Sequence, residues 1–226
     1  MSSKNNGAPS IPNDHYPTPL HAVTRLYEAC PEVRKWTRYL DPMADEGQLV
    51  EHLGKLNQRA RLDANELRPE CAKVLALTVG NYTIGDAFDI DGGRFAEACV
   101  TTNPAFTLFE RTARHFRSAP VLALLGPAAY LSGGGLRNGI VKDLGMPDIY
   151  LIPERLAFVR VTYMDEDGRV LASGSSDSQG SAWYVWHERR EEGSTRQLRE
   201  PTAAEKRSHV PPTWVNVVRA EDWETA

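Results

Sequence analysis

The chain has 226 residues, which is more than an average domain and fewer than two, so we expect a single domain with short extensions. Hydrophobic residues make up 41% and charged residues 25%, and this ordinary globular composition excludes a chain that is disordered throughout. The net charge of -4 excludes a general electrostatic attraction to nucleic acid, so binding to DNA or RNA would need a local basic surface.

The sequence lacks the usual signals for membrane insertion, secretion and metal binding. The longest mostly apolar run, residues 121–131, is shorter than the roughly 20 residues that a membrane-spanning helix needs. Residues 1–13 contain no hydrophobic segment, so we expect no signal peptide and a cytoplasmic location. We expect neither a disulfide framework nor a metal site, because Cys30, Cys71 and Cys99 form no closely spaced pair and no two histidines stand four residues apart.

Helical and extended patterns alternate along the first 125 residues. After Thr18 and Pro19, apolar residues recur at three- and four-residue steps, which is typical of a helix with a polar cap and an early proline. The run Val121–Leu125 is apolar throughout, as in strands buried on both faces of a parallel sheet. In chain order we expect a helix at 19–30, a strand at 36–40, a helix at 49–56, a strand at 61–66, a helix at 69–77, extended structure at 81–88, a strand at 98–102, a helix at 107–116 and a strand at 121–125. This alternation predicts a three-layer α/β fold with a mostly parallel sheet.

The pattern changes after the glycine-rich stretch at 133–135. Two runs rich in aromatic and β-branched residues, 157–164 and 182–187, are predicted to form a terminal pair of strands, at least one of them antiparallel. From residue 188 onward the chain is charged and contains few apolar residues. We therefore predict a flexible N-terminal tail at 1–13, a folded domain at 14–190 and a charged C-terminal extension at 191–226.

Polar residues stand at the ends of the predicted strands. Ligands bind outside the carboxyl ends of the strands in a parallel α/β sheet. Asp41 follows the first strand, Glu66 ends the second, Asp86 lies in the third extended run and Asn103 follows the fourth strand. Taken singly, each has an ordinary interpretation, because Asp-Pro and Asn-Pro are common turn dipeptides and Glu66 suits a solvated surface position. Their order along the chain favours one shared ligand site.

Several short segments carry a resemblance to a known family. They are, in chain order, Asp14–Pro19, Asp41–Gly47, Asn65–Glu66, Gly85–Phe88, Asn103–Phe106 and Ser181–Trp186. This ordered set resembles the motifs of phage-type adenine-N6 DNA methyltransferases, which are class I S-adenosylmethionine-dependent methyltransferases. The likeness covers residues 13–199. It implies a Rossmann-like methyltransferase fold with a mostly parallel seven-stranded sheet and an antiparallel C-terminal strand.

The resemblance also implies that S-adenosylmethionine is the cofactor. The contacts that it implies are Tyr16, Thr18 and Pro19 at the methionine end, Asp41, Ala44 and Gly47 in the cofactor loop, Glu66 at the ribose hydroxyls, and Asp86 and Phe88 at the adenine. A carboxylate at a strand end, about twenty residues after a glycine-bearing loop, is suitably placed to accept both ribose hydroxyls. Tyr16 and Phe88 would also suit a hydrophobic core. Asp45 stands where the family has glycine, a residue that adopts a positive φ without strain, and aspartate tolerates this conformation better than most other residues do. The carboxylate of Asp45 is expected to oppose that of the cofactor.

The segment Asn103–Phe106 resembles the catalytic NPPF motif. The exocyclic amine of adenine is a poor nucleophile, because its lone pair is delocalised into the ring. The side-chain oxygen of Asn103 and the carbonyl of Pro104 are expected to accept its two hydrogens and favour a pyramidal nitrogen, with no strong base. Phe106 is expected to stack on a base flipped out of the duplex. Ala105 replaces the second proline of the motif and leaves Pro104 less restrained.

The predicted function is therefore methyl transfer from S-adenosylmethionine to the N6 amine of adenine in DNA, as in a phage-encoded enzyme. Two alternatives stay open: a weak or inactive methyltransferase-like protein that binds DNA or a protein partner, and a methyltransferase that acts on an RNA adenine or a glutamine amide. Charged helix faces are often simply solvated, but a local basic set could follow the phosphates. This set consists of Arg111, Arg114, Arg117, Arg137 and Lys142.

Overall fold

The computed structural model describes residues 18–131, 139–154, 156, 160–164, 170–175, 180–187, 195–200, 202 and 204. Tyr16 and Arg137, which the sequence analysis singled out, lie outside these residues, as does the glycine-rich stretch at 133–135. The described helices include none that is long and apolar enough to cross a bilayer.

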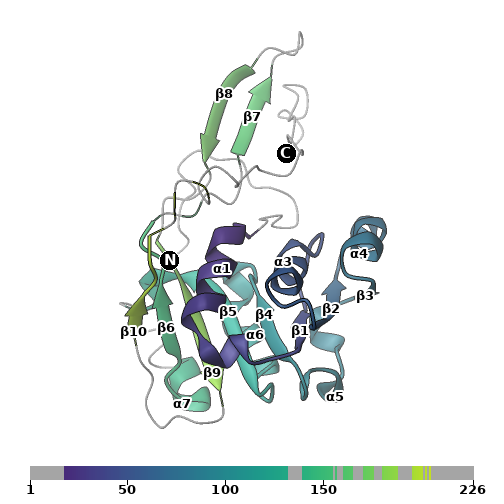
Figure 1. Cartoon of the computed structure of the whole chain (residues 1–226), viewed down its shortest axis with the longest axis vertical. Coiled ribbons are helices and arrows are strands. Elements are labelled where there is room, and N and C mark those ends of the chain that lie inside the picture. Colours follow the sequence, from purple (N-terminus) through teal and green to yellow (C-terminus); the bar gives the residue numbers. More distant parts are fainter. Residues whose placement is uncertain are drawn as a thin grey trace.

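A mixed sheet forms the centre of the molecule (Figure 1). Its strands are β1 (Arg38–Asp41), β2 (Arg61–Glu66), β3 (Asn81–Ile84), β4 (Cys99–Thr102), β5 (Val121–Pro127), β6 (Asp148–Leu151), β9 (Ser181–His187) and β10 (Thr195–Gln197). They lie side by side in the order β10-β6-β9-β5-β4-β1-β2-β3, and β9 runs antiparallel to both of its neighbours. This confirms the predicted Rossmann-like fold. Seven strands form the expected sheet, and β10 adds an eighth at one edge, parallel to β6.

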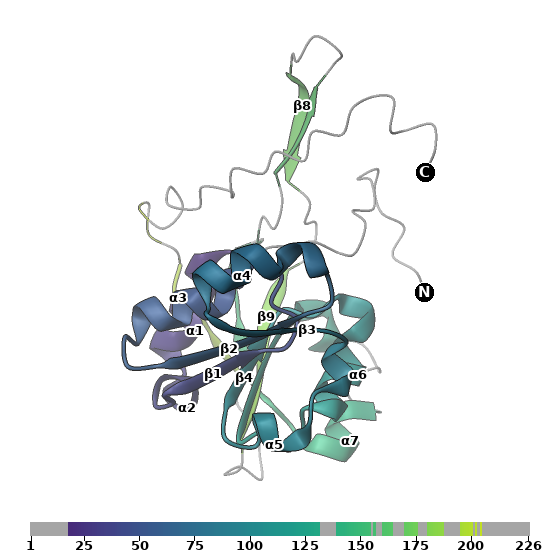
Figure 2. The ribbon, with the colours of Figure 1, turned by 90° about the vertical axis from the view of Figure 1, so that its right-hand side faces the viewer.

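Helices cover both faces of this sheet (Figure 2). One face carries α1 (Leu20–Ala29), α2 (Pro31–Arg34), α3 (Gln48–Leu56) and α4 (Ala72–Thr78), and the other carries α5 (Gly92–Phe95), α6 (Phe109–His115) and α7 (Val141–Leu144). Two separate buried clusters lie between the sheet and these two helical layers. Side chains alternate between them along β5, where Ala123 joins the first cluster and Leu122 and Leu124 join the second. The three-layer arrangement explains why β5 is apolar throughout.

The C-terminal strands pair differently from the prediction. The strand predicted at 157–164 does not pair with β9; its described part, β7 (Arg160–Met164), forms a separate antiparallel hairpin with β8 (Val170–Ser175). Strand β9 lies instead between β5 and β6, because nearly all its side chains are buried and a two-stranded ribbon could not cover both of its faces. The sequence analysis missed β6, which has only four residues.

The predicted domain boundaries remain predictions, with one relevant observation. Strand β10 belongs to the main sheet although it lies in the segment that we assigned to the C-terminal extension. Leu198, directly after β10, is buried in the first core cluster. The extended run predicted at 81–88 is also shorter, because β3 ends at Ile84 and Ala87–Asp89 form a 3-10 turn.

Candidate functional site

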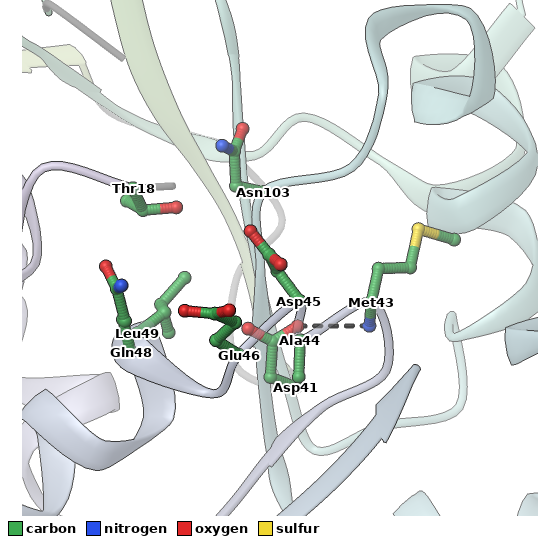
Figure 3. A pocket seen from close by; sticks show the side chains of 9 residues that line it. All are labelled: Thr18, Asp41, Met43, Ala44, Asp45, Glu46, Gln48, Leu49 and Asn103. Carbon is green, nitrogen blue, oxygen red and sulfur yellow. Dashed lines mark hydrogen bonds between the residues drawn. The ribbon is translucent and has the colours of Figure 1, made fainter. Parts of the chain in front are cut away.

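A pocket lies at the carboxyl ends of β1 and β4, where the sequence analysis placed the ligand site (Figure 3). Three separate parts of the chain form its wall: Thr18 before α1, the loop after β1, and Asn103 after β4. The lining residues are Thr18, Asp41, Met43, Ala44, Asp45, Glu46, Gln48, Leu49 and Asn103. Four residues predicted from the sequence, Thr18, Asp41, Ala44 and Asn103, thus meet around one space.

Asn65 holds the loop after β1 against the neighbouring strands. Its side-chain amide donates to the carbonyl of Pro42 (3.1 Å) and to that of Gly85 (3.0 Å), and its side-chain oxygen accepts the hydroxyl of Thr83 (2.7 Å). Its own backbone carbonyl accepts the amide of Ala44 (2.8 Å). The sequence analysis gave Asn65 no role. A polar residue in a fully buried stretch of β2 is the signal that could have identified it as a positioning residue.

The backbone of the same loop is left-handed at two positions. Gly47, which begins α3, has a φ of 81°, and a Cβ there would come within 2.6 Å of the side chain of Val79. Asp45 has a φ of 54°, so the left-handed conformation expected of a glycine position is retained although the residue is aspartate. Aspartate tolerates this region better than most residues do. The loop therefore keeps a glycine-like shape at both points.

Asp41 is a buried carboxylate at the wall of the pocket. Its side chain is only 2% exposed and accepts the amide of Met43 (3.1 Å; dashed in Figure 3). Burial raises the pKa of Asp41 to about 7, and the neighbouring carboxylates of Glu66 and Asp45 push in the same direction. The hydroxyl of Thr102 and the amide of Met43 offset this effect only in part. A cationic ligand in the pocket would therefore stabilise the ionised form of Asp41.

Glu66, the predicted ribose acceptor, already has several partners. One carboxylate oxygen accepts the backbone amide of Asp45 (2.7 Å). The other accepts both the backbone amide (3.1 Å) and Nε (2.9 Å) of Arg68. The guanidinium of Arg68 also pairs with the carboxylate of Asp45. Asp45 and Glu66 thus share the single positive charge of Arg68, which differs from our expectation that the carboxylate of Asp45 simply opposes that of the cofactor. The sequence analysis missed Arg68, a cation only two residues beyond Glu66.

The two residues predicted at the cofactor's adenine lie outside the pocket wall. The carboxylate of Asp86 is exposed and accepts the amide of Phe88 (2.9 Å), which caps the 3-10 turn at Ala87–Asp89. The ring of Phe88 packs against His115 (5.4 Å between centroids), and the guanidinium of Arg111 lies 3.7 Å from its centroid. These contacts form part of a second, open groove along α6, lined by Phe88, Thr107, Glu110, Arg111, Arg114 and His115.

The turn after β4 combines a buried base with an exposed tip. Pro104 is buried, Ala105 has an extended backbone (φ -50°, ψ 135°), and Phe106 is 40% exposed. The hydroxyl of Tyr130 donates to the carbonyl of Phe106 (2.9 Å), which ties the tip to the segment after β5. Phe106 is therefore accessible from solvent, whereas Asn103 faces the pocket. Tyr130 is a further positioning residue that the sequence analysis missed.

The residues of the predicted basic set differ in their surroundings. Arg114 pairs with Glu110 (2.8 Å) and with Asp143, so its charge is already balanced. Arg111, Arg117 and Lys142 are exposed. Within the described part of the chain no group of three or more His, Cys, Asp or Glu side chains could hold a metal ion.

S-adenosylmethionine, which the resemblance implies, carries a sulfonium, an ammonium and a carboxylate group, so its net charge is positive at neutral pH, and the pocket offers carboxylates of the opposite charge. Asp41, Asp45 and Glu46 all line it. At Glu66, however, Arg68 already uses acceptor positions that ribose hydroxyls would need. The chemistry of the residues therefore suits the methionine end, but the pocket of the free chain, at about 20 Å³, must widen to admit it, and Glu66 suits the ribose once it exchanges a partner.

Comparisons with known proteins bear on the fold. No protein-family model matches the chain, and a search of curated proteins finds no match. Among solved structures, the chain is similar to the methyltransferase subunit of a type I restriction-modification system from Streptococcus thermophilus, with a TM-score of 0.56 and 12% identity over 86% of this chain and 52% of that one. It is also similar to a proposed RNA methyltransferase from Pyrococcus horikoshii, with a TM-score of 0.52 and 16% identity over 80% of this chain and 91% of that one.

The chain thus spans about half the length of the Streptococcus thermophilus subunit. At these identities the likeness concerns the arrangement of the helices and strands. It agrees with the strand order and the antiparallel β9, so the chain has the Rossmann-like fold found in methyltransferases.

Proposed function

We propose that the chain binds S-adenosylmethionine at the carboxyl ends of β1, β2 and β4 and transfers its methyl group to the N6 amine of adenine in DNA. One observation carries the proposal: Asn103 lines the same pocket as Thr18 and the Asp41 loop, although about sixty residues separate Asn103 from that loop. A cofactor site and an acceptor site must adjoin for a group to pass between them. The acid-lined wall favours a cationic ligand.

The residues of this chain have distinct roles in holding the cofactor. Thr18 and Asp41 line the space assigned to its methionine end. Glu66, which lies at the end of the neighbouring strand β2 and outside the wall of this pocket, is the acceptor for its ribose hydroxyls. Asn65 and Gly47 fix the conformation of the loop after β1. When bound, S-adenosylmethionine supplies an electrophilic methyl group. The task left to the protein is to orient the acceptor amine.

The turn Asn103–Phe106 performs this orientation. The side-chain oxygen of Asn103 and the carbonyl of Pro104 accept the two hydrogens of the exocyclic amine. The nitrogen then becomes pyramidal, and its lone pair is less delocalised into the ring. Both acceptors also stabilise the positive charge that develops on the nitrogen as its bond to the methyl group forms and the bond from that methyl group to sulfur breaks. The amine then releases one proton to solvent, so no strong base is needed. Phe106 is exposed at the tip of the turn and stacks on the extruded base.

A macromolecular acceptor would approach the site at this edge of the sheet. Because β9 is antiparallel to β5 and β6, the carboxyl end of β6 and the amino end of β9 lie at the same edge as Asp41 and Asn103. The β7–β8 hairpin is inserted between them and projects away from the sheet (Figure 1). Arg111 and Arg117 on the α6 side are the cations that we assign to phosphate contacts. Such an enzyme acts in the cytoplasm, in a bacterial host if it is phage encoded.

A second candidate is a protein of the same fold without methyltransferase activity. The observation that favours it is the pairing of Glu66 with Arg68, because a ribose acceptor that never releases its partner cannot bind the cofactor.

An RNA adenine or a glutamine amide also presents a planar amino group, whose hydrogens Asn103 and Pro104 would accept.

Transfer of a labelled methyl group tests the proposal. The full chain is incubated with S-adenosyl[methyl-3H]methionine and, in parallel, with unmethylated bacterial DNA, RNA or protein extract, and Asn103→Ala serves as the control. We expect label in DNA, recovered as N6-methyladenine after digestion to nucleosides, and none with Asn103→Ala. Label only in RNA or protein moves the acceptor to those classes, and no label in any of them contradicts the enzyme.

A further inference from the structure

Arg68 is the feature of the site that neither the resemblance nor the proposed function explains. It lies just after β2 and holds Glu66 through its backbone amide and its Nε, while its guanidinium pairs with Asp45. We call this group of three residues, Asp45, Glu66 and Arg68, the Arg68 latch. Its side chains are largely buried, with that of Arg68 14% exposed and that of Glu66 8% exposed. Such charge-assisted hydrogen bonds are stronger than neutral ones.

The acceptor capacity of Glu66 is the limiting quantity. An ionised carboxylate offers about four lone-pair positions. Three of them are used, by the amides of Asp45 and Arg68 and by Arg68 Nε. A ribose with two free hydroxyls donates two hydrogen bonds, so one present donor must leave before both can be accepted. The count leaves no other way to bind the whole diol at Glu66.

The donor that leaves can be identified from the geometry. The amide of Asp45 is fixed by the left-handed turn of the loop, and that of Arg68 by the chain directly after β2. Arg68 Nε is the only one of the three that belongs to a side chain, and this side chain retains some solvent exposure. Rotation of the Arg68 side chain therefore frees an acceptor position on Glu66 without moving the backbone.

We infer that the Arg68 latch controls cofactor affinity: Arg68 competes with the ribose for Glu66 and must swing away when a nucleoside with a free 2′,3′-diol binds. This inference rests on the proposed function, because it takes Glu66 as the ribose acceptor. It makes Arg68 a positioning residue that opposes binding. It also assigns Asp45 a purpose in this chain, because the carboxylate that replaces glycine anchors the outer end of the guanidinium.

Calorimetric titration of the full chain tests the latch. The ligands are S-adenosylmethionine and 5′-methylthioadenosine, which carries the same ribose without the amino-acid end. Arg68→Met removes the guanidinium but keeps the length of the side chain. We expect it to bind both ligands about tenfold more tightly than the parent, since a competing charged hydrogen bond is lost. Thermal unfolding should show a lower Tm for free Arg68→Met, because Asp45 and Glu66 lose their cation.

Arg61→Met is the matched control. Arg61 is the first residue of the same strand, its side chain is 66% exposed, and it lies 3.7 Å from Asp63 rather than near Glu66. The Arg61→Met variant should bind both ligands as the parent does. Arg68→Lys keeps the charge but loses the planar fork and should lie between the parent and Arg68→Met. It also decides the matter if Arg68→Met does not fold.

The outcomes separate the latch from the proposed function. If Arg68→Met binds more tightly than the parent and Arg61→Met binds like the parent, the result supports both the cofactor assignment and the latch. The same holds if the parent binds too weakly to measure and Arg68→Met binds measurably. A parent that binds S-adenosylmethionine and an Arg68→Met that binds equally or less tightly would overturn the latch alone. If neither binds, the cofactor assignment and the latch are both wrong.

Discussion

The two halves of the candidate cofactor site differ in how their carboxylates are satisfied. At the end of β1, Asp41 is buried at the wall of the small pocket, and the hydroxyl of Thr102 and the amide of Met43 offset its burial only in part. At the end of β2, Glu66 is equally buried, but Arg68 and the amide of Asp45 already occupy it. The two acids lie on adjacent parallel strands, at the same edge of the sheet.

This difference shows that position in the fold does not by itself make a binding group available. Under the proposed function, a cationic ligand would supply the counter-charge of Asp41, so its ionisation and ligand binding would be coupled. Glu66 carries its counter-charge within the chain, so a ligand has to displace a partner. Binding of a cation at Asp41 displaces no partner within the chain, whereas binding at Glu66 requires a conformational change.

The largest expected effect concerns the acceptor side, which adjoins the half that contains Asp41. Asn103→Ala removes a side-chain acceptor aimed at the substrate amine, so methyl transfer should fall by roughly a hundredfold or more. Affinity for S-adenosylmethionine should not change, because Asn103 is assigned to the acceptor. Transfer is measured with labelled cofactor and affinity by calorimetry. An Asn103→Ala protein with parental activity would exclude the amine-orienting role.

Gly47, in the loop after β1, is tested against two glycines that flank β3. Gly47→Ala combines a positive φ with a Cβ within 2.6 Å of Val79 and should destabilise the fold by about 3 kcal/mol. Gly80→Ala shares the positive φ in open space and should cost about 1 kcal/mol. Gly85→Ala has neither problem and should stay within about 0.5 kcal/mol of the parent. Urea unfolding gives all three values, and equal effects at Gly47 and Gly80 would show that the contact with Val79 is relieved at no cost.

Asp41→Asn separates stability from binding in the first half. The pKa of Asp41 rises from 3.8 to about 7 in the folded state, so between these values the folded chain keeps a proton that the unfolded chain releases. Stability of the parent should therefore fall as the pH rises from about 4 to about 7 and then level off. Asp41→Asn lacks this loss and should be more stable than the parent at pH 8, on the order of 4 kcal/mol.

Cofactor affinity should show the opposite trend in the same protein. A bound cation favours ionised Asp41, so the parent should bind S-adenosylmethionine more tightly at pH 8 than at pH 6. Asp41→Asn should bind more weakly at pH 8 and lose most of that pH dependence. Denaturant curves and calorimetry at the two pH values check both trends. A parent whose affinity is flat across this range would mean that Asp41 does not face the ligand's charge.

The smallest effect is expected on nucleic-acid affinity, outside both halves. Arg111→Ala removes an exposed cation that stacks on Phe88, and it should weaken DNA binding a few-fold and reduce the salt slope by about 1. Arg114→Ala is the control, since Glu110 and Asp143 already balance its charge. Fluorescence anisotropy over a salt series measures both. A larger loss with Arg114→Ala than with Arg111→Ala would reverse our ranking of the basic set.

The parts of the molecule that the sequence predicted well are those set by local pattern. Strand β2 was placed at 61–66 as observed, and the alternation of strands and helices gave the three layers. Asp41 and Asn103 could be brought together in advance, because the carboxyl ends of parallel strands share one edge. The proximity of Asp41 and Asn103 therefore follows from the strand topology alone.

The parts that could not be predicted depend on side-chain partners and on short segments. Strand β6 has four residues, too few for a clear periodic signal, and without it β9 had no second neighbour. The pairing of Arg68 with Asp45 joins residues on different loops, and no spacing rule encodes it. The closed state of the second half is therefore a tertiary property. The placement of Phe88 against α6 has the same origin.

A crystal structure of the full chain with S-adenosylhomocysteine at pH 8 tests the comparison most directly. We predict that the amino-acid end lies along Thr18 and Asp41, in a pocket that is wider than in the free chain. We also predict that the ribose hydroxyls lie on Glu66 and that the Arg68 side chain has turned away from it. A ligand bound elsewhere, or a ribose bound while Arg68 Nε still donates to Glu66, would contradict this account.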